Sequence, residues 1–476
     1  MEFLDRQEEI KRLRNALNRD SGPSFVVVYG RRRLGKSTLI KRVLTADDIY
    51  YMAGDFMDRV QLNLFRNQAA TKFPELANID FSSWEDMLLM INRLTTKRFA
   101  ICLDEFPYMV RQTPSLPSSL QRLIDTKSLK FDLIICGSSQ RMMQNMVLSS
   151  SEPLYGRANA IINVQPIPIP FLQKALDLDA TATVEEYSVW GGVPRYWELR
   201  EEYHDLHEAI IETMFNQTGV LYDEPKNLFF DDMNSVVQAE SLMSIVAGGA
   251  SRLSEIASRV GRDATALSAP IDRLIKMHYL RREIPFGEDS KKAKKSLYQI
   301  NDPLMDFYYS FVIPNLSNIG RNRINFIDNY IASNFTGYVA KWWEHLCREA
   351  VSGNSLFGHL WKEASRWWGS IPTQQRQPDG KKYIEMEFDV ITESTDRKAL
   401  LVGECKWTNP EVAGELLRRL NEKISMLPLA AGKTVYPVLF LKNKPKDEPT
   451  GCRILYPQDV INLTYGDSGK DYISEK

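Results

Sequence analysis

The chain has 476 residues, of which 43% are hydrophobic and 25% are charged, and its formal net charge is −1. This composition is typical of a globular protein with about three domains, and it excludes a chain that attracts nucleic acid by overall positive charge. It also argues against a secreted disulfide scaffold or a membrane protein, because the five cysteines are scattered, the first residues are polar and no apolar run could cross a bilayer. We therefore expect a cytoplasmic protein with no membrane partner.

Strands alternate with helical patterns over residues 1–165, which predicts a parallel sheet. A charged helix is expected over 5–17, and the apolar run Phe25–Tyr29 leads directly into G-R-R-R-L-G-K-S. These letters fit the P-loop pattern, in which backbone N–H groups surround phosphate oxygens, the lysine contacts the β- and γ-phosphates and the serine ligates Mg²⁺. We predict that ATP and Mg²⁺ bind at Gly30, Arg31, Arg32, Arg33, Leu34, Gly35, Lys36, Ser37 and Thr38.

Two later apolar runs end in polar residues that suit the hydrolysis of a nucleoside triphosphate. Phe99–Leu103 ends in Asp104 and Glu105. Asp104 is predicted to hold Mg²⁺, through water, and Glu105 to polarise the attacking water. Leu133–Cys136 ends in Gly-Ser-Ser, where Ser138 is expected to sense the γ-phosphate by a hydrogen bond.

Three other features complete this region. A strand is expected at 49–53, and a helix over 82–96 has Ser82 or Ser83 as its N-cap. Arg157, in L-Y-G-R, has two open interpretations: an arginine that stabilises the transition state, or one side of a surface salt bridge.

The proline-rich stretch 166–170 cannot continue a regular ladder and marks a boundary, after which a helical lid is expected over 166–235. From 236 to 312 the pattern predicts a winged helix, in which helices precede a two-stranded hairpin. Its helices are expected at 242–247, 253–260 and 264–277, and its strands at 279–282 and 296–300. Pro270 counts against the third helix.

The loop between the two strands of the winged helix is rich in lysine. It carries Lys291, Lys292, Lys294 and Lys295. Lysines at such a tip suit contacts to DNA phosphates. A winged helix that serves only for packing, with a solvated lysine loop, remains open.

The rest of the chain divides into a linker at 313–335, a domain at 336–465 and a polar tail at 466–476. Within the domain, the alternating run 383–391 is expected to form a hairpin with 398–407.

This hairpin brings Asp389 beside Glu404 and Lys406. Two carboxylates can hold Mg²⁺ against a scissile phosphate, and the lysine can orient or deprotonate water. Glu344, in a helix expected at 339–351, can complete the metal site. A hairpin with a surface salt bridge is the alternative.

Asp389 followed by Glu404-Cys405-Lys406 resembles the PD-(D/E)xK nuclease core, whereas Pro378-Asp379 precedes the strand and is assigned to a turn. The whole chain is similar to archaeal and bacterial ATPases, related to STAND and AAA+ proteins, that carry a C-terminal nuclease-like domain. The further matching motifs are F-x-x-R (Phe3, Arg6), L-D-E (103–105), G-S-S (137–139), L-Y-G-R (154–157), G-G-V-P-R-Y (191–196) and N-D-P-L (301–304).

The resemblance implies an α/β protein with a P-loop NTPase sheet, a helical lid, a winged helix and a restriction-endonuclease-like C-terminal domain. It also implies that Phe3 and Arg6 lie near the adenine. The expected function is a Mg²⁺-dependent switch ATPase coupled to DNA binding and to a metal-dependent DNA endonuclease. A signalling scaffold and a transcription regulator remain alternatives, in which the C-terminal domain binds without cleaving. The sequence leaves open the DNA substrate, a homo-oligomeric state and whether Arg157 acts in cis or in trans.

Overall fold

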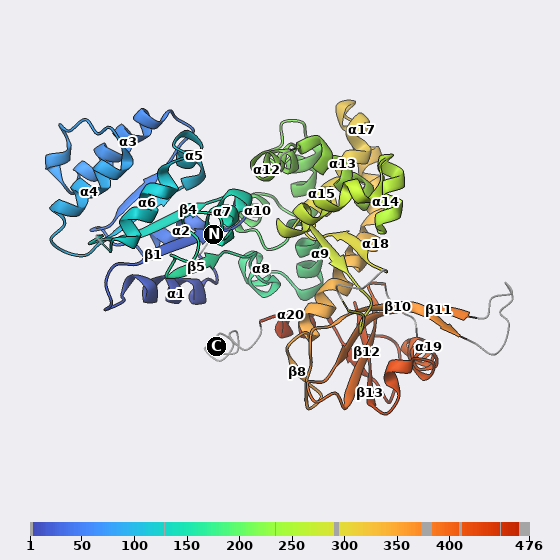
Figure 1. The fold of residues 1–476 in the computed structure, drawn as a ribbon. Helices are drawn as coiled ribbons and strands as arrows, with labels where there is room; N and C mark the ends of the chain where they lie inside the picture. The colour runs from blue at the N-terminus through green and yellow to red at the C-terminus, as the bar shows by residue number, and fades with distance from the viewer. Residues whose placement is uncertain are drawn as a thin grey trace.

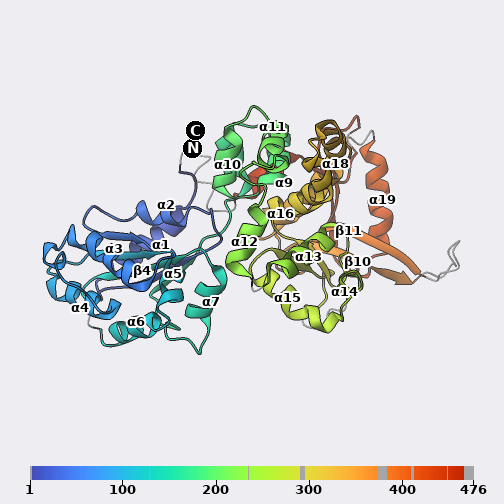
Figure 2. The same ribbon diagram turned by 90° about the horizontal axis from the view of Figure 1, so that it is seen from above.

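The computed structural model describes residues 3–127, 129–233, 235–289, 295–372, 383–408, 412–447 and 449–465. These residues form a mixed α/β protein with an N-terminal sheet domain at one end, helical modules in the middle and a second sheet domain at the other end (Figure 1). Seen from above, the N-terminal domain forms one lobe, and α7, α10 and α12 lie where it meets the remainder (Figure 2).

The N-terminal sheet is parallel, with the strand order β2-β3-β4-β1-β5. Its strands are β1 (Phe25–Tyr29), β2 (Ile49–Met52), β3 (Ala100–Asp104), β4 (Asp132–Gly137) and β5 (Ala160–Asn163). Its helices are α1 (Gln7–Leu17), α2 (Lys36–Lys41), α3 (Asp58–Ala70), α4 (Trp84–Leu94), α5 (Phe106–Gln112), α6 (Leu116–Asp125) and α7 (Gln140–Leu148). Because parallel strands share their carboxyl edge, the loops after β1, β3 and β4 meet there.

Both faces of this sheet are covered, as expected of parallel strands that are apolar throughout. Val27 and Tyr29 of β1 pack in the cluster that includes α3, α4 and α6, whereas Val26 and Val28 pack in the cluster that includes α1 and the lid. The predicted helix at 82–96 is present as α4, and Ser83 caps it by accepting a hydrogen bond from the Asp86 N–H. Strand β5 was not predicted, because its apolar core is short.

The middle of the chain is helical. The lid contains α8 (Ile169–Leu176), α9 (Ala180–Trp190), α10 (Pro194–Glu201), α11 (Leu206–Ile210), a π-helical turn (Ile211–Phe215) and α12 (Glu224–Asp232). The next module contains α13 (Val236–Ala247), α14 (Leu253–Val260), α15 (Ala264–Lys276), β6 (Leu280–Glu283) and β7 (Leu297–Ile300). Strands β6 and β7 pair antiparallel, so the module has the winged-helix outline. Helix α15 continues through Pro270.

Residues 313–335 are not an extended linker, which corrects the expectation from sequence. After α16 (Pro303–Phe307) and a π-helical turn (Tyr308–Val312), the chain forms α17 (Leu316–Gly320) and the long helix α18 (Ile324–Val351). The N-terminal half of α18 carries buried apolar residues such as Ile327 and Ile331 and is therefore part of the core.

The C-terminal sheet has the order β10-β11-β12-β13-β14. Its strands are β10 (Ser365–Pro372), β11 (Tyr383–Glu393), β12 (Ala399–Lys406), β13 (Thr434–Leu441) and β14 (Arg453–Leu455), and it is accompanied by α19 (Ala413–Ser425), α20 (Pro457–Leu463) and the small hairpin β8 (Ser355–Leu356) and β9 (His359–Leu360). β10 to β12 pair antiparallel, and β12 to β14 pair parallel. Pro378-Asp379 and the tail after 465 lie outside the described residues.

The modules share one hydrophobic cluster. It runs from the N-terminal sheet through Trp190 of the lid and Tyr279 of the winged helix to Trp343 of α18 and Leu401 of β12. The C-terminal domain is therefore packed on the lid and is not suspended from a linker. Among the described helices, none combines the length and the apolar character that a membrane span requires.

Candidate functional site

The phosphate loop between β1 and α2 has the backbone shape that its glycines allow. Gly35 has φ 82°, in the left-handed region. A Cβ on Gly30 would lie 2.5 Å from the Val164 carbonyl oxygen, so only glycine fits beside the end of β5. The Lys36 ammonium, 5% exposed, donates to the Arg31 carbonyl at 2.9 Å and so lies within the loop.

The carboxyl edge of the sheet brings Ser37 and Asp104 together. The Ser37 hydroxyl donates to the Asp104 carboxylate at 2.6 Å, and the Tyr50 hydroxyl donates to the same oxygen at 2.5 Å. Burial and the hydrogen bond to Asp104 raise the pKa of Tyr50, which keeps it a donor. The two residues predicted to hold Mg²⁺ therefore lie within hydrogen-bond distance of each other.

Glu105 and Ser138, which the sequence analysis treated separately, form a pair. The Ser138 hydroxyl and backbone N–H donate to the Glu105 carboxylate at 2.7 and 3.3 Å. Glu105 adopts φ 53°, which is costly for a non-glycine residue. A Cβ on Gly137 would meet Pro107 at 2.6 Å, so this glycine permits the close approach of the two loops.

Phe3 and Arg6 lie beside the phosphate loop. Arg6 is buried, pairs with Glu9 at 3.0 Å and donates to the Leu34 carbonyl at 3.3 Å. The Arg42 guanidinium lies 5.1 Å from the centre of the Phe3 ring. Arg6 therefore lies beside the start of α2 and Phe3 beside its end. That the two residues lie near the adenine stays a prediction.

Arg157 lies away from the phosphate loop of its own chain. It lies just before β5, where Asn159 pairs with Phe25 at the amino end of β1, across the sheet from the P-loop. Its guanidinium forms two hydrogen bonds of 2.8 Å with Asp125. This is the surface salt bridge that the sequence left open.

The side chains of Arg31 and Arg33 leave the phosphate loop and contact other modules. Arg31 is buried and forms an ion pair with Asp302, directly after the winged helix. It also lies 3.3 Å from the Tyr196 hydroxyl. Arg33 pairs with Glu224 at 2.7 Å, and Tyr196 donates to Glu224 at 2.9 Å. That these residues bind phosphate stays a prediction: the two side chains form the ion pairs described, and the backbone N–H groups belong to the loop.

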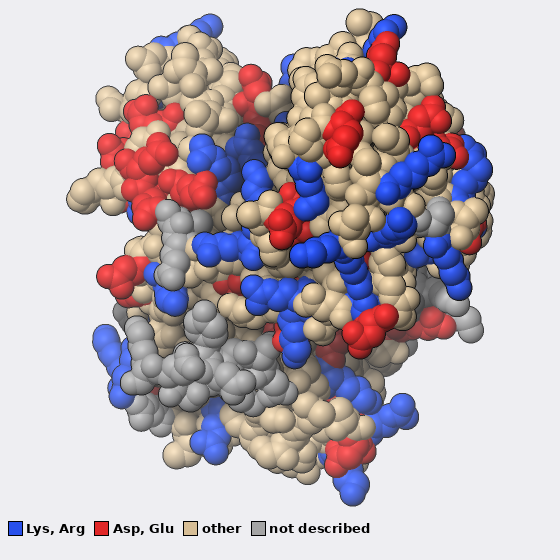
Figure 3. All heavy atoms as spheres, turned by 90° about the vertical axis from the view of Figure 1, so that its left-hand side faces the viewer, with Lys and Arg blue, Asp and Glu red and all other residues tan. Residues whose placement is uncertain are grey.

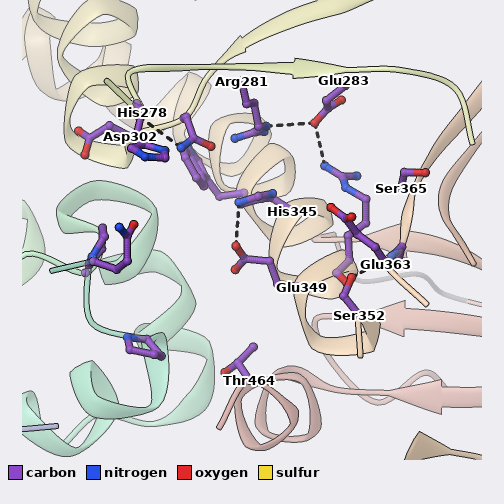
Figure 4. A pocket seen from close by; sticks show the side chains of 18 of the residues that line it. His278, Arg281, Glu283, Asp302, His345, Glu349, Ser352, Glu363, Ser365 and Thr464 are labelled. Atoms are coloured by element: carbon purple, nitrogen blue, oxygen red, sulfur yellow. Dashed lines mark hydrogen bonds and ion pairs between the residues drawn. The ribbon is translucent and has the colours of Figure 1, made fainter. Parts of the chain in front are cut away.

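A cavity of about 1180 Å³ lies where the lid, the winged helix and the C-terminal domain meet. Figure 4 shows charged side chains on its walls, among them Arg281 and Glu283 from β6 and His345 and Glu349 from α18. His345 lies 3.2 Å from Glu349. Burial lowers the pKa of His345 despite this partner.

Glu283 is the acceptor for three arginines in this region. Arg281 lies at 3.0 Å, Arg366 of β10 at 3.4 Å and Arg348 of α18 at 3.5 Å from its carboxylate oxygens. Burial opposes ionisation of Glu283, but the three arginines outweigh it and lower its pKa to about 2. The carboxylate is 14% exposed, so water screens these pairs little.

We expect Glu283→Gln to lower the free energy of unfolding at pH 7 by on the order of 3 kcal/mol. Since the folded-state pKa of about 2 lies below the ordinary 4.5, this stability is full above pH 4.5 and is lost as the pH falls toward 2. Urea denaturation of both proteins from pH 7 to pH 2.5 measures it. Glu255→Gln, at an exposed pair with Arg259, is the control. A Glu283→Gln difference that grows on acidification would contradict the expectation.

The C-terminal hairpin brings Asp389, Glu404 and Lys406 together. Val390 of β11 pairs with Gly403 of β12, so Asp389 faces Glu404 across the hairpin. Asp389 accepts the Cys405 N–H at 2.8 Å. The Glu404 carboxylate is held by two lysines, Lys406 at 2.7 Å and Lys423 of α19 at 3.2 Å. Lys423 was not predicted, because it lies outside the hairpin pattern.

Glu344 of α18 lies near enough to Asp389 to feel its negative charge. Burial, and then the charge of Asp389, raise the pKa of Glu344 to about 7. Burial and the charge of Glu404 also raise the pKa of Asp389. Among the described residues, however, no group of three or more His, Cys, Asp or Glu side chains is arranged to hold a metal ion. Glu344, Asp389 and Glu404 are therefore near enough to influence one another's pKa, but their side chains do not form a metal-binding geometry among the described residues.

Only part of the predicted DNA interface can be placed. Lys291, Lys292 and Lys294 lie outside the described residues, and Lys295 is exposed. Figure 3, seen from the side of the N-terminal domain, shows Lys and Arg side chains gathered in the hollow between the two upper lobes and in a band below it. The net charge near zero thus conceals locally positive surface.

Two segments of the chain match models of known protein families. Residues 3–198 match a family described as an ATPase domain predominantly from Archaea, and residues 308–423 match a family of archaeal and bacterial proteins of unknown function. An uncharacterised protein of Methanocaldococcus jannaschii is 28% identical over 456 residues, which are 94% of this chain and 97% of that protein.

Among solved structures, a Walker-type ATPase of Pyrococcus abyssi aligns with a TM-score of 0.50 and 18% identity, over 64% of this chain and 96% of its own. The ORC2 protein of Aeropyrum pernix aligns with a TM-score of 0.44 and 14% identity, over 68% of this chain and 96% of its own. The first of these likenesses shows a shared fold. Residues 3–198 are therefore similar to an ATPase domain found predominantly in Archaea, and residues 308–423 to a domain of archaeal and bacterial proteins of unknown function.

Proposed function

We propose that the protein is a Mg²⁺-dependent ATP-hydrolysing switch whose nucleotide state is communicated to the winged helix and the C-terminal domain. The observation that carries the proposal is the ion pair between Arg31 of the phosphate loop and Asp302 after the winged helix. A nucleotide in the loop lies next to a side chain that already holds another module. Binding or release of phosphate therefore changes the contacts between modules.

The polar edge of the sheet supplies the groups that hydrolysis needs. Lys36 brings positive charge to the phosphates, and Ser37 and Asp104 hold Mg²⁺. When the hydrogen bond between Ser138 and Glu105 breaks, the Glu105 carboxylate can polarise the attacking water. The Ser138 hydroxyl can then donate to the γ-phosphate. The pair of Glu105 and Ser138, 2.7 Å apart, is then a resting state that ATP opens.

The experiment that tests this proposal measures release of inorganic phosphate by the purified full-length chain at saturating Mg·ATP. Turnover that requires Mg²⁺ and is lost in Lys36→Ala supports it. ATP binding without turnover, in the presence and absence of DNA, favours a nucleotide-dependent scaffold instead.

A second candidate function, a metal-dependent DNA endonuclease, is favoured by the C-terminal site. Asp389 and Glu404 are like charges on neighbouring strands, and the raised pKa of Asp389 reflects their repulsion together with burial. A divalent cation would relieve this repulsion if it displaced Lys406 and Lys423 from Glu404. Lys406 would then lie beside the scissile phosphate. DNA binding without cleavage is the alternative function, and it would use the same site.

The winged helix is proposed to contact the DNA backbone. Replacing Lys291, Lys292, Lys294 and Lys295 by Ser should weaken binding uniformly across sequences and reduce the log–log salt slope by up to about 4. Fluorescence anisotropy with duplexes of different sequence, at several salt concentrations, measures both quantities. Equal slopes in the variant and the original protein would assign the module to packing.

A further inference from the structure

The winged helix forms ion pairs toward both the phosphate loop and the acidic site of the C-terminal domain. At one end Asp302 uses one carboxylate oxygen to hold Arg31 and the other to cap α16, by accepting the Met305 N–H at 2.8 Å. At the other end Glu283 of β6 holds Arg348 of α18 and Arg366 of β10. Asp302 and Glu283 lie at the two ends of one small hairpin, so a shift at one is carried along it.

Arg281 joins the two ends of this hairpin. Its guanidinium donates to the Ile300 carbonyl at 3.1 Å, to the Gln299 side chain at 2.6 Å and to Glu283 at 3.0 Å. Ile300 ends β7, two residues before Asp302. Arg281 also lies over the Trp342 ring of α18, at 5.4 Å from the ring centre. Figure 4 shows Arg281 pointing along the cavity wall toward Glu283.

Further polar contacts lead from Glu283 to the acidic site of the C-terminal domain. Arg348 reaches past Glu283 to donate to the main-chain carbonyl of Asp389 at 3.0 Å, and it lies 3.9 Å from Glu344. Arg366 pairs with Glu283 and with Glu387 on the same strand as Asp389. Arg348 thus holds α18 against β11 at Asp389, and Glu283 in turn holds Arg348.

We propose that Glu283 is a positioning residue for the C-terminal acidic site, and that the contacts Arg281–Glu283–Arg348 transmit the making or breaking of the Arg31–Asp302 pair to Asp389. The inference rests on the proposed function for its purpose, since it describes how ATP would regulate the acidic site. Its physical content is a set of polar contacts that runs from the Arg31–Asp302 pair along the hairpin to the Asp389 main chain.

Hydrogen–deuterium exchange of the full-length chain tests the proposal. In Glu283→Gln, and in Asp302→Asn, amides of β11 and β12 around Asp389 and Cys405 should exchange at least about ten-fold faster than in the original protein, because a charged buried contact is lost. Glu255→Gln, at an exposed pair of the same module, should leave them unchanged. Mg·ATP should alter exchange in β11 and β12 of the original protein but not of Glu283→Gln.

A second variant separates positioning from charge balance, because Glu283→Gln leaves three arginines without their shared acceptor. The double variant Glu283→Gln/Arg281→Gln restores the net charge but still frees Arg348. Fast exchange in both variants supports positioning, whereas recovery in the double variant overturns it. Unaltered β11 and β12 exchange in Glu283→Gln also overturns it.

The inference and the proposed function fail differently. A chain that neither binds Mn²⁺ nor cleaves DNA, yet loses β11 and β12 protection in Glu283→Gln, loses the nuclease proposal and keeps the inference. A chain that hydrolyses ATP in a Mg²⁺-dependent reaction but keeps that protection in Glu283→Gln keeps the proposed function and loses the inference.

Discussion

Glu105→Gln should reduce ATP turnover by at least about 100-fold while leaving ATP binding intact, because the attacking water loses its polarising carboxylate. Asp104 and Ser37 remain in place in this variant, so Mg²⁺ and phosphate still have their ligands. Gln is close to Glu in shape and can still meet Ser138, so a large loss in rate reports chemistry and not folding. Phosphate release at saturating Mg·ATP and equilibrium binding of a fluorescent ATP analogue measure the two quantities.

Two other variants serve as comparisons for Glu105→Gln. Lys36→Ala should weaken nucleotide binding itself, because the ammonium within the loop is lost. Glu8→Gln, an exposed position on α1, removes the same charge elsewhere in the domain and should change neither quantity. An unchanged rate in Glu105→Gln would remove Glu105 from the role of general base, and the water would then need another partner at this edge of the sheet.

The P-loop and the acidic strand end could be predicted because each depends on neighbouring residues. G-R-R-R-L-G-K-S fixes its own backbone, and the position of Asp104 follows from the apolar run before it. The parallel sheet then brings them together without further information. The hairpin at Asp389 was predicted for the same reason, since alternation in β11 and β12 sets which side chains share a face.

Contacts between distant modules could not be predicted in this way. Arg31 and Asp302 are 271 residues apart, and nothing local in either segment indicates the other. Arg31 was predicted to belong to a phosphate site because it lies within the P-loop pattern. Arg348 and Lys423 lie on helices whose patterns predict only which face is buried, and their roles depend on how those helices pack against β11 and β12.

The helical state of residues 313–335 and the continuation of the predicted third helix through Pro270 have the same origin. Residues 313–335 contain too few strong local signals to show that they begin a 28-residue helix, and their helical state depends on packing against the lid. Pro270 is tolerated in α15 because that helix is held by Leu267, Ile271 and Leu274, which are buried in the core. In both places tertiary burial outweighs local preference.

Asp389→Asn should abolish both metal-dependent stabilisation and DNA cleavage while leaving ATP turnover intact. Asn keeps an oxygen that can accept the Cys405 N–H but removes the charge that a cation requires. If the original protein binds Mn²⁺ at this site, a concentration of 100 times the dissociation constant should stabilise it by about 2.7 kcal/mol, and the variant by nothing. The full-length chain is used, because one hydrophobic cluster joins the C-terminal domain to the lid.

Two matched variants locate the effect. Glu385→Gln removes a carboxylate from the same face of β11, four residues away and exposed, and should retain metal binding and cleavage. Lys406→Ala should retain metal binding but lose cleavage, since the lysine acts on water or on the developing phosphate charge. It also frees one oxygen of Glu404, so metal affinity should if anything rise. If the original protein shows neither Mn²⁺-dependent stabilisation nor cleavage of linear, supercoiled or branched DNA, the lysines that hold Glu404 are its permanent partners. The domain then recognises its ligand without cutting it.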